Sequence, residues 1–331
     1  MGASPVFVSG LINLETTLLV EGFPVPYYPV RYPFNGVKST VSGVGFNVAR
    51  ALTALGRPVH FASLVGSDPA GRLAIDALQA GGVATEHVLP ILGQTPQSVI
   101  LYDSSGRRQI NVDLKDIQEH IYPPEQIAAG LAGCELAALC NINFSRALLR
   151  LARAAGKRIA TDVHAIGSLD DDYNQDFMRA ADILFMSDEA LPEPPEGWAR
   201  QVLGRFTNEI LVIGLGGRGA LLAVRRDRYV GGFPAVYTRP VVNTIGAGDA
   251  LFSGFLHFYL KEGNPYRALE KAMRFASYKI GENGAAEGFL SEEELEKTYP
   301  PGPFPSGEGG EEGKEDAAGT HSNGEGGEVQ Q

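Results

Sequence analysis

Short apolar runs alternate with helically spaced segments through the second half of the chain. From residue 124 onward, five runs have the length and composition of buried strands, at residues 136–139, 158–161, 183–185, 210–213 and 220–224. The spacing of apolar positions between them predicts helices at about residues 145–155, 177–181 and 197–206. Such alternation is typical of a parallel sheet with helices on both faces, so we expect an α/β fold.

The first 116 residues add two β-rich pieces to this pattern. Strands and helices alternate here as well, at residues 6–8, 47–55, 59–65 and 70–80. The pieces at about 11–40 and 94–116 do not fit the alternation, because the first is too rich in proline for a helix and the second reads as a hairpin. We expect them to pair with each other as a small lid sheet on one side of the domain.

The segment NTIGAGDALFSGFLHFYL, residues 243–260, joins a glycine turn to an apolar helix. From Leu251 the apolar positions recur at helical spacing, which places Gly246, Ala247 and Gly248 just before the first turn and Asp249 in it. A helix N-terminus offers unpaired N–H groups and a partial positive charge, and both favour an anion. The alternative is structural: Asp249 caps the helix and the glycines only make the turn.

Two further glycine-rich segments are candidate ligand sites. In SGVGFN, residues 42–47, glycines let the backbone approach a ligand, and Asn47 at a helix start can bond a hydroxyl or cap the helix. In GLGGRG, residues 214–219, the spacing GxGxxG is followed by another strand pattern, whereas a dinucleotide-binding fingerprint must open a helix. We therefore interpret this segment as a turn between two strands that can border a nucleotide.

Composition and charge exclude several classes of protein. The chain has 331 residues, 44% hydrophobic and 20% charged, and a formal net charge of -11, of which residues 303–331 carry -6. This negative charge therefore argues against nucleic acids and anionic membranes as partners. No apolar run is long enough to span a bilayer, and no signal peptide is recognisable. Because Cys134 and Cys140 have neither CxxC nor metal-ligand spacing, we expect a reduced, cytoplasmic protein.

Four segments together resemble the ribokinase-like carbohydrate kinases, the PfkB family. In chain order they are GLINLE at 10–15, SGVGFN at 42–47, LVIGLGGRGALL at 211–222 and TIGAGDALFSGF at 244–255. The resemblance covers about residues 5–290. It implies a three-layer α/β/α domain at residues 1–299, with a mostly parallel central sheet and a small β-sheet lid. The acidic, glycine-rich residues 300–331 have the composition of a disordered tail.

The resemblance implies ATP-dependent phosphorylation of a hydroxyl of a small sugar. Asp249 would be the general base, beside an anion hole formed by Gly246, Ala247 and Gly248. The residues expected to bind the sugar are Asn13, Glu15, Gly43, Gly45, Asn47 and Asp249. Those expected to border ATP are Ser187, Gly214, Gly216, Gly219 and Asn283.

Several positions depart from the family's pattern. Glu15 stands in place of the usual Asp, and Val44 in place of a frequent Lys, which argues against a phosphosugar substrate. Mg²⁺ would bridge the ATP phosphates mainly through water, but the family's NxxE is degraded near residues 187–190, where Asp188 or Glu189 would have to substitute. Asn243 replaces an Asp that in many members helps hold an activating monovalent cation, so cation activation is open.

Two alternative functions remain within the same fold. A nucleoside kinase is one, because aromatic residues of the lid segment can stack on a base; they are Tyr27, Tyr28, Tyr32 and Phe34. The same side chains equally suit lid packing or a homodimer formed through the lid. The other alternative is a pseudokinase that binds a sugar or nucleotide without turnover. In every case the expected partner is a small molecule.

Overall fold

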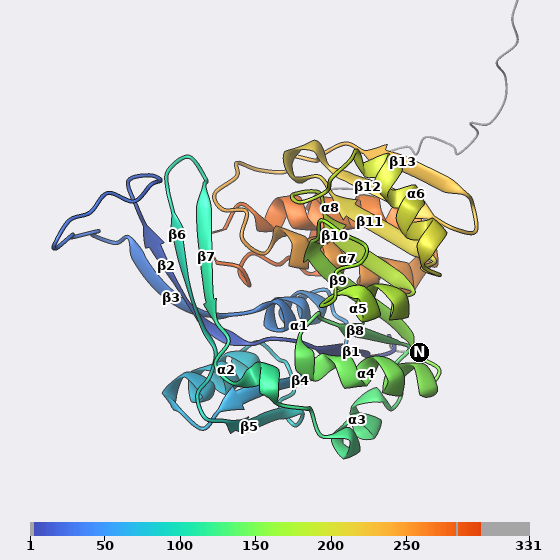
Figure 1. Ribbon diagram of the computed structural model, residues 1–331, viewed down its shortest axis with the longest axis horizontal. Helices are drawn as coiled ribbons and strands as arrows, with labels where there is room; N and C mark the ends of the chain where they lie inside the picture. The colour runs from blue at the N-terminus through green and yellow to red at the C-terminus, as the bar shows by residue number, and fades with distance from the viewer. Residues whose placement is uncertain (1–2, 283, 299–331) are drawn as a thin grey trace, which may run out of the picture. The chain divides into compact units, whose positions relative to one another are not determined.

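The central sheet of the domain has nine strands in the order β13-β12-β11-β10-β9-β8-β1-β4-β5 (Figure 1). This computed structural model describes residues 3–282 and 284–298, which lie in a single compact unit. The strands are β1 (Val6–Ser9), β4 (Val59–Gly66), β5 (Val88–Leu92), β8 (Leu136–Leu139), β9 (Arg158–Ala165), β10 (Ile183–Ser187), β11 (Ile210–Gly214), β12 (Ala220–Val224) and β13 (Tyr229–Phe233). Every predicted strand is present. The tail at residues 300–331 lies outside the described residues.

The sheet is parallel from β5 to β11 and antiparallel beyond. In the β11–β12 pair, Ile210 lies opposite Val224 and Gly214 opposite Ala220, so the GLGGRG segment turns the chain straight back on itself. This confirms that a strand, not a helix, follows those glycines. Because most strands are parallel, their carboxyl ends meet at one edge of the sheet, where ligands of open α/β sheets bind.

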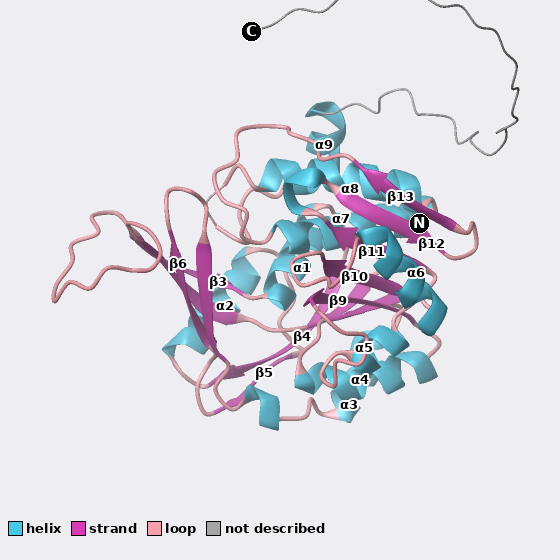
Figure 2. Ribbon diagram, turned by 45° about the horizontal axis from the view of Figure 1, so that its top comes forward, coloured by secondary structure: helices cyan, strands magenta, loops and turns pink. Residues whose placement is uncertain are grey.

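Helices cover both faces of the sheet, as predicted (Figure 2). One layer contains α1 (Val44–Ala54), α2 (Pro69–Ala80), α7 (Ala247–Glu262), α8 (Pro265–Lys279) and α9 (Glu292–Thr298). The other contains α3 (Pro124–Leu131), α4 (Asn143–Ala154), α5 (Gln175–Ala180) and α6 (Pro195–Arg205). Alternate residues of β1 serve the two layers, since Val6 and Val8 pack on the first and Phe7 on the second.

A second, four-stranded sheet forms the lid, with the order β3-β2-β6-β7. Its strands are β2 (Asn13–Leu19), β3 (Val37–Ser42), β6 (Gln97–Tyr102) and β7 (Arg108–Asp113). The two β-rich pieces meet where Glu15 of β2 lies opposite Ser98 of β6, which confirms the predicted pairing. Figure 1 shows this sheet projecting to the side of the central sheet, with the long segment between β2 and β3 at its tip.

Helix α8 was not predicted, although its start signal is plain. Asn264 and Pro265, interpreted only as the end of the preceding helix, also begin the next one. The Asn264 side chain accepts hydrogen bonds from the N–H groups of Tyr266 and Arg267, and Pro265 occupies the first helical position. Helix α8 then packs along α7, and its last residue, Lys279, is fully buried.

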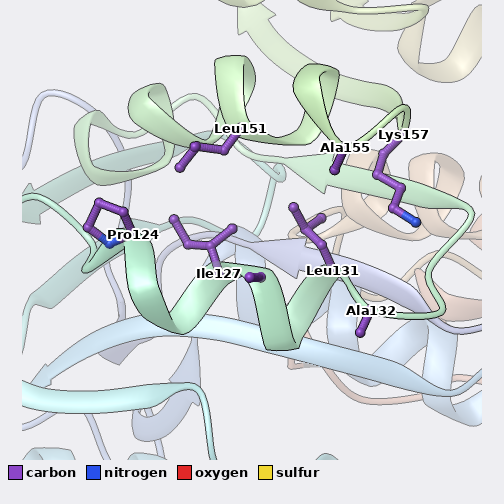
Figure 3. A pocket seen from close by; sticks show the side chains of 8 residues that line it. Pro124, Ile127, Leu131, Ala132, Leu151, Ala155 and Lys157 are labelled. Carbon is purple, nitrogen blue, oxygen red and sulfur yellow. The ribbon is translucent and has the colours of Figure 1, made fainter.

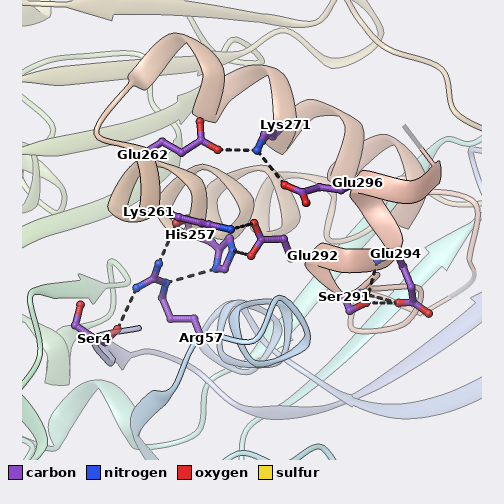
Figure 4. A network of polar contacts seen from close by, with 10 residues as sticks. All are labelled: Ser4, Arg57, His257, Lys261, Glu262, Lys271, Ser291, Glu292, Glu294 and Glu296. Atoms are coloured by element: carbon purple, nitrogen blue, oxygen red, sulfur yellow. Dashed lines mark hydrogen bonds and ion pairs between the residues drawn. The ribbon is translucent and has the colours of Figure 1, made fainter. Parts of the chain in front are cut away.

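A buried polar network fastens α9 to α7 (Figure 4). Arg57 donates to Nδ1 and to the carbonyl oxygen of His257, at 3.5 and 3.1 Å, and to the carbonyl of Ser4 at 3.0 Å. The Nε2 of His257 donates to Glu292 at 3.2 Å, and Lys261 pairs with the same carboxylate at 2.5 Å. Burial lowers the pKa of His257 to about 4, with Arg57 adding to the effect, so the ring is neutral in the folded protein at pH 7.

Candidate active site

The glycine turn before α7 lies at the ligand-binding edge of the sheet and begins the helix earlier than predicted. Gly246 is the N-cap, and Ala247 and Gly248 already lie in the first turn. Gly246 has a φ of 76°, and an added Cβ would lie 2.6 Å from the carbonyl oxygen of Ala285, so only glycine fits there. At Gly248 an added Cβ would meet no heavy atom within 4 Å. The first turn of α7 therefore faces open space at Gly248, while Asp249 in the same turn is buried.

Asp249 is held by packing and by one hydrogen bond. Phe252 and Phe255 of α7 pack edge-on against Phe185 of β10, with ring centroids 5.1 and 5.3 Å apart, and this contact anchors the helix on the sheet. Nδ2 of Asn47 donates to Oδ2 of Asp249 at 2.7 Å. Because Gly246 is the N-cap and no side chain caps the helix, the alternative that Asp249 is a helix cap is wrong.

Burial dominates the electrostatics of Asp249. Its side chain is 9% exposed, and desolvation raises the pKa of the carboxyl group, while the hydrogen bond from Asn47 opposes this. A carboxylate with a raised pKa is a better proton acceptor near neutral pH than an exposed one.

Two of the residues expected to bind the sugar leave a buried acceptor atom unpaired within the described part of the chain. The amide oxygens of Asn13 and Asn47 are buried, and neither has a hydrogen-bond partner in the described part of the chain. The corresponding amide nitrogens are engaged, that of Asn47 with Asp249 and that of Asn13 with the Ser98 hydroxyl at 2.9 Å. Glu15 is buried as well; burial raises its pKa, although the Ser42 hydroxyl bonds to it. Buried acceptors without donors are an arrangement that a hydroxyl-rich ligand completes.

Gly43 and Gly45 serve the packing of α1. An added Cβ at Gly43, where φ is 109°, would lie 2.6 Å from the Leu11 carbonyl oxygen, and one at Gly45 would lie 2.5 Å from the backbone of Gly10. These glycines let α1 approach the end of β1 at backbone distance. Gly43 is the N-cap of α1, so Asn47 does not cap that helix and its side chain is available to the site.

Lys279 is a site residue that the sequence analysis missed. It is 0% exposed, and its Nζ donates to the carbonyl oxygen of Ile245, the residue before the N-cap of α7. Burial lowers the pKa of Lys279 to about 8, against the opposing effect of Asp249 and Glu15. A signal existed, because Lys279 continues the buried stripe of Ala268, Ala272 and Phe275 at helical spacing, where an apolar residue is expected.

The lid touches the glycine turn through two strands. Nη1 of Arg108, on β7, donates to the Thr244 hydroxyl at 2.7 Å. Ile100, on β6, packs with Ile245 and Ala285 in a small buried cluster. A third contact joins Lys38 of β3 to Glu287, 2.9 Å apart. Arg108 brings a positive charge to the site that the sequence analysis did not foresee, since β7 reads only as one arm of a hairpin.

The residues expected to border ATP lie at the ends of two neighbouring strands. Ser187 ends β10 and Gly214 ends β11 opposite it; Gly216 and Gly219 follow in the turn. Gly219 is required by its φ of 106° and by the Phe233 carbonyl, which an added Cβ would overlap. Next to Gly216 an added Cβ would meet no heavy atom within 4 Å. Asn283 lies outside the described residues.

In the part of the chain that the structure describes, no carboxylate cluster marks a metal site. Within residues 3–282 and 284–298, no three His, Cys, Asp or Glu side chains gather as metal ligands. Asp188 pairs with Arg218, and Glu189 is exposed.

An apolar hollow elsewhere is not the site. It has a volume of about 320 Å³ and lies between α3 and α4, in the helix layer opposite α7 (Figure 3). Ile127, Leu131 and Leu151 line it, and the ammonium group of Lys157 at its edge donates to the Cys134 carbonyl at 2.7 Å. It lacks the convergent polar groups of a ligand site.

No helix among the described residues is long and apolar enough to cross a membrane.

Known proteins share this architecture. The model of the pfkB family of carbohydrate kinases matches residues 4–292. The ATP-dependent ribose-1-phosphate kinase of Halopiger xanaduensis is 29% identical over 285 residues, 85% of this chain and 93% of that protein. The structure of a microbiome-derived acarbose kinase aligns with a TM-score of 0.80 at 28% identity, covering 90% of this chain and 99% of that one. Ribokinase of Arabidopsis thaliana aligns at 0.73 and 19% identity over 90% and 99%, which shows the fold alone.

Proposed function

The chain belongs to the pfkB family of carbohydrate kinases, and from this premise we propose that it transfers the γ-phosphoryl group of ATP to a hydroxyl of a small sugar, with Asp249 as the base. A kinase with a hydroxyl acceptor follows from the family; the acceptor and the residue roles are the proposal. One observation carries it: the buried carboxylate in the first turn of α7 accepts a hydrogen bond from Asn47, whose own amide oxygen is buried and has no partner among the described residues.

The buried acceptors of the site favour a polyol as substrate. Each hydroxyl of a sugar can donate one hydrogen bond, and the amide oxygens of Asn13 and Asn47 can each accept one. Glu15 and Asp249 add two carboxylates. A bound sugar would relieve the cost of leaving such acceptors buried and unpaired, which is about 1–3 kcal/mol for each group.

The chemistry assigned to the site is an in-line displacement. Asp249 takes the proton of the acceptor hydroxyl; the hydroxyl oxygen bonds to the γ-phosphorus, and the bond from that phosphorus to the bridging oxygen of ADP breaks. Of the three residues proposed as the anion hole, Gly246 and Gly248 would hold the transferring phosphoryl group through their N–H groups at the positive end of α7. The N–H of Ala247 donates to the Thr244 carbonyl at 3.2 Å and would have to be shared with the phosphoryl group. The lid, in contact with Thr244 and Ile245, would exclude water.

ATP is expected to lie along the ends of β10 and β11. Ser187, Gly214, Gly216 and Gly219 are its proposed contacts, supported by the open space beside Gly216. Asn283 remains part of the proposal. Mg²⁺ would neutralise charge on the phosphates, and Glu189 is the exposed carboxylate proposed to reach it through water.

A homodimer through the lid is the proposed assembly. The segment between β2 and β3 exposes large apolar side chains, with exposed fractions of 88% for Tyr27, 75% for Tyr32 and 87% for Phe34. An exposed apolar group of this size commonly marks an interaction surface. The same exposure gives no specific support to base stacking, so a sugar is preferred over a nucleoside.

A substrate panel tests the proposal. ADP release is measured with ribose, fructose, ribose 1-phosphate, acarbose, adenosine, cytidine and pseudouridine as acceptors. Turnover with at least one sugar is the expected result. Turnover with nucleosides alone would make the protein a nucleoside kinase. Ligand-induced thermal shifts without any turnover would make it a binding protein.

A further inference from the structure

The ammonium group of Lys279 lies inside the protein, directly behind the glycine turn. Lys279 is the last residue of α8 and is fully buried, so its charge is compensated by protein groups rather than by water. Its Nζ donates to the carbonyl oxygen of Ile245. The carbonyl of Ile245 and the N–H of Gly246 belong to one planar trans peptide group and point in opposite directions. An ammonium that holds the carbonyl therefore orients and polarises the first N–H of the proposed anion hole.

The charges around Lys279 are mostly negative. The strongest charges acting on it are the carboxylates of Asp249, Glu15 and Glu287, followed by the guanidinium of Arg108. Without a cation at this position, the carboxylates would repel the phosphoryl group that the turn has to hold. The ammonium group of Lys279 offsets the charge of these carboxylates and, being part of the chain, cannot dissociate as a bound ion can.

Several other groups of the turn are also engaged in hydrogen bonds. The N–H groups of Val242 and Asn243 donate to the Ile280 carbonyl at 2.8 and 3.0 Å. The Oδ1 of Asn243 accepts from the N–H of Ile245 at 2.8 Å. A monovalent cation would need oxygen ligands here, and the candidate oxygens of Asn243 and Ile245 are both engaged by donors. The residues present therefore do not fit a bound monovalent cation.

We propose that Lys279 is a built-in cation for this site: a positioning residue that fixes the Ile245–Gly246 peptide and makes the enzyme independent of monovalent cations. The inference rests on the proposed function, because it concerns the same anion hole. It resolves the question raised by Asn243, since a neutral amide suffices where the cation is a side chain of the protein.

The wild-type protein provides the first test. Turnover of the best sugar is measured in chloride salts of potassium and of tetramethylammonium at equal ionic strength. Rates that agree within twofold are expected. A rate that rises tenfold or more with potassium would overturn the proposal. If no acceptor is turned over at all, the proposed function fails, and the thermal measurement below still tests Lys279.

Variants at position 279 provide the second test. Lys279→Ala should lower kcat on the order of tenfold to a hundredfold, with a smaller change in the KM of the sugar, because the loss concerns the transferring group. Potassium or methylammonium ions should restore part of kcat, and should raise the Tm of Lys279→Ala more than tetramethylammonium does. Lys271→Ala is the matched control, because Lys271 lies on the same helix and pairs with Glu262 at 2.6 Å. An unchanged kcat of Lys279→Ala would contradict the built-in cation. A lower kcat would contradict it as well if no small cation raised either the kcat or the Tm of this variant. Lys279→Met serves if the alanine variant does not fold.

Discussion

Asn47 and Asp249 lie 202 positions apart in the chain, yet the Asn47 amide donates a 2.7 Å hydrogen bond to the Asp249 carboxylate. The bond joins the first turn of α1 to the first turn of α7. Each of these helices begins at a glycine with positive φ, 109° at Gly43 and 76° at Gly246. The two turns thus bring an amide and a carboxylate together.

Asp249→Asn should remove turnover while leaving sugar binding nearly intact. The amide cannot accept the acceptor's proton, so kcat should fall roughly 100- to 10,000-fold. Steady-state kinetics and isothermal titration with the best sugar measure the two effects separately. Asp227→Asn is the control, since Asp227 is a surface residue bonded to Tyr266. A variant with near wild-type kcat would show that another group is the base.

Asn47→Leu should move the pH profile of kcat/KM. The Asn47 hydrogen bond lowers the pKa of Asp249, so its loss raises that pKa further. Activity requires the ionised carboxylate; the acidic limb of the profile should therefore shift to higher pH. Asn13→Leu is the matched control, because the Asn13 amide donates to Ser98 and not to Asp249. It should raise the KM of the sugar roughly threefold to tenfold without moving the limb. Equal pH profiles for both variants would argue against the assigned role of the bond.

Arg108→Ala should weaken closure of the lid. Its guanidinium is bonded to Thr244 of the glycine turn, whereas that of the neighbouring Arg107 pairs with Asp103 inside the lid, 2.8 Å away. We expect kcat/KM to fall for Arg108→Ala by roughly tenfold to 150-fold, the equivalent of one hydrogen bond to a charged group. Arg107→Ala has the same change of charge and should leave kcat/KM within twofold. Comparable losses in both variants would mean that lid charge, not the Thr244 contact, matters.

His257 should make the fold sensitive to mild acid. Its pKa is about 4 in the folded protein and about 6.5 in an unfolded chain, so the unfolded state binds more protons between these values. The neutral His257 ring therefore makes its full contribution to the free energy of unfolding above about pH 6.5. This contribution is lost as the pH drops toward 4, by roughly 3 kcal/mol over the whole range. Urea unfolding of wild type and His257→Gln between pH 4.5 and 7.5 measures this. The pH slope should diminish in His257→Gln and persist in His120→Gln, whose ring is partly exposed.

Much of the fold was predictable from local patterns. The strand pattern at residues 136–139 and at 220–224 matches β8 and β12 to the residue, because strands that are buried on both faces are short, continuous apolar runs. Strand β13 was missed, since its two glycines hide the pattern, and α3 begins at a proline after a loop with no clear period. The lid pairing was predictable only because its two pieces fitted nowhere else.

The candidate site also contains residues that the sequence predicted and residues that only the structure identified. The sequence by itself determined the glycine turn, Asp249 and Asn47, because each belongs to a compact motif whose chemistry depends on residues a few positions apart. Only the tertiary structure decided that Lys279 and Arg108 belong to the same site. Lys279 comes from the end of α8, where the helical pattern marks it only as buried, and Arg108 comes from the lid, where no local pattern distinguishes it from a surface cation. Which charges meet depends on how helices and sheets pack, and that packing is fixed by contacts between residues far apart in the chain.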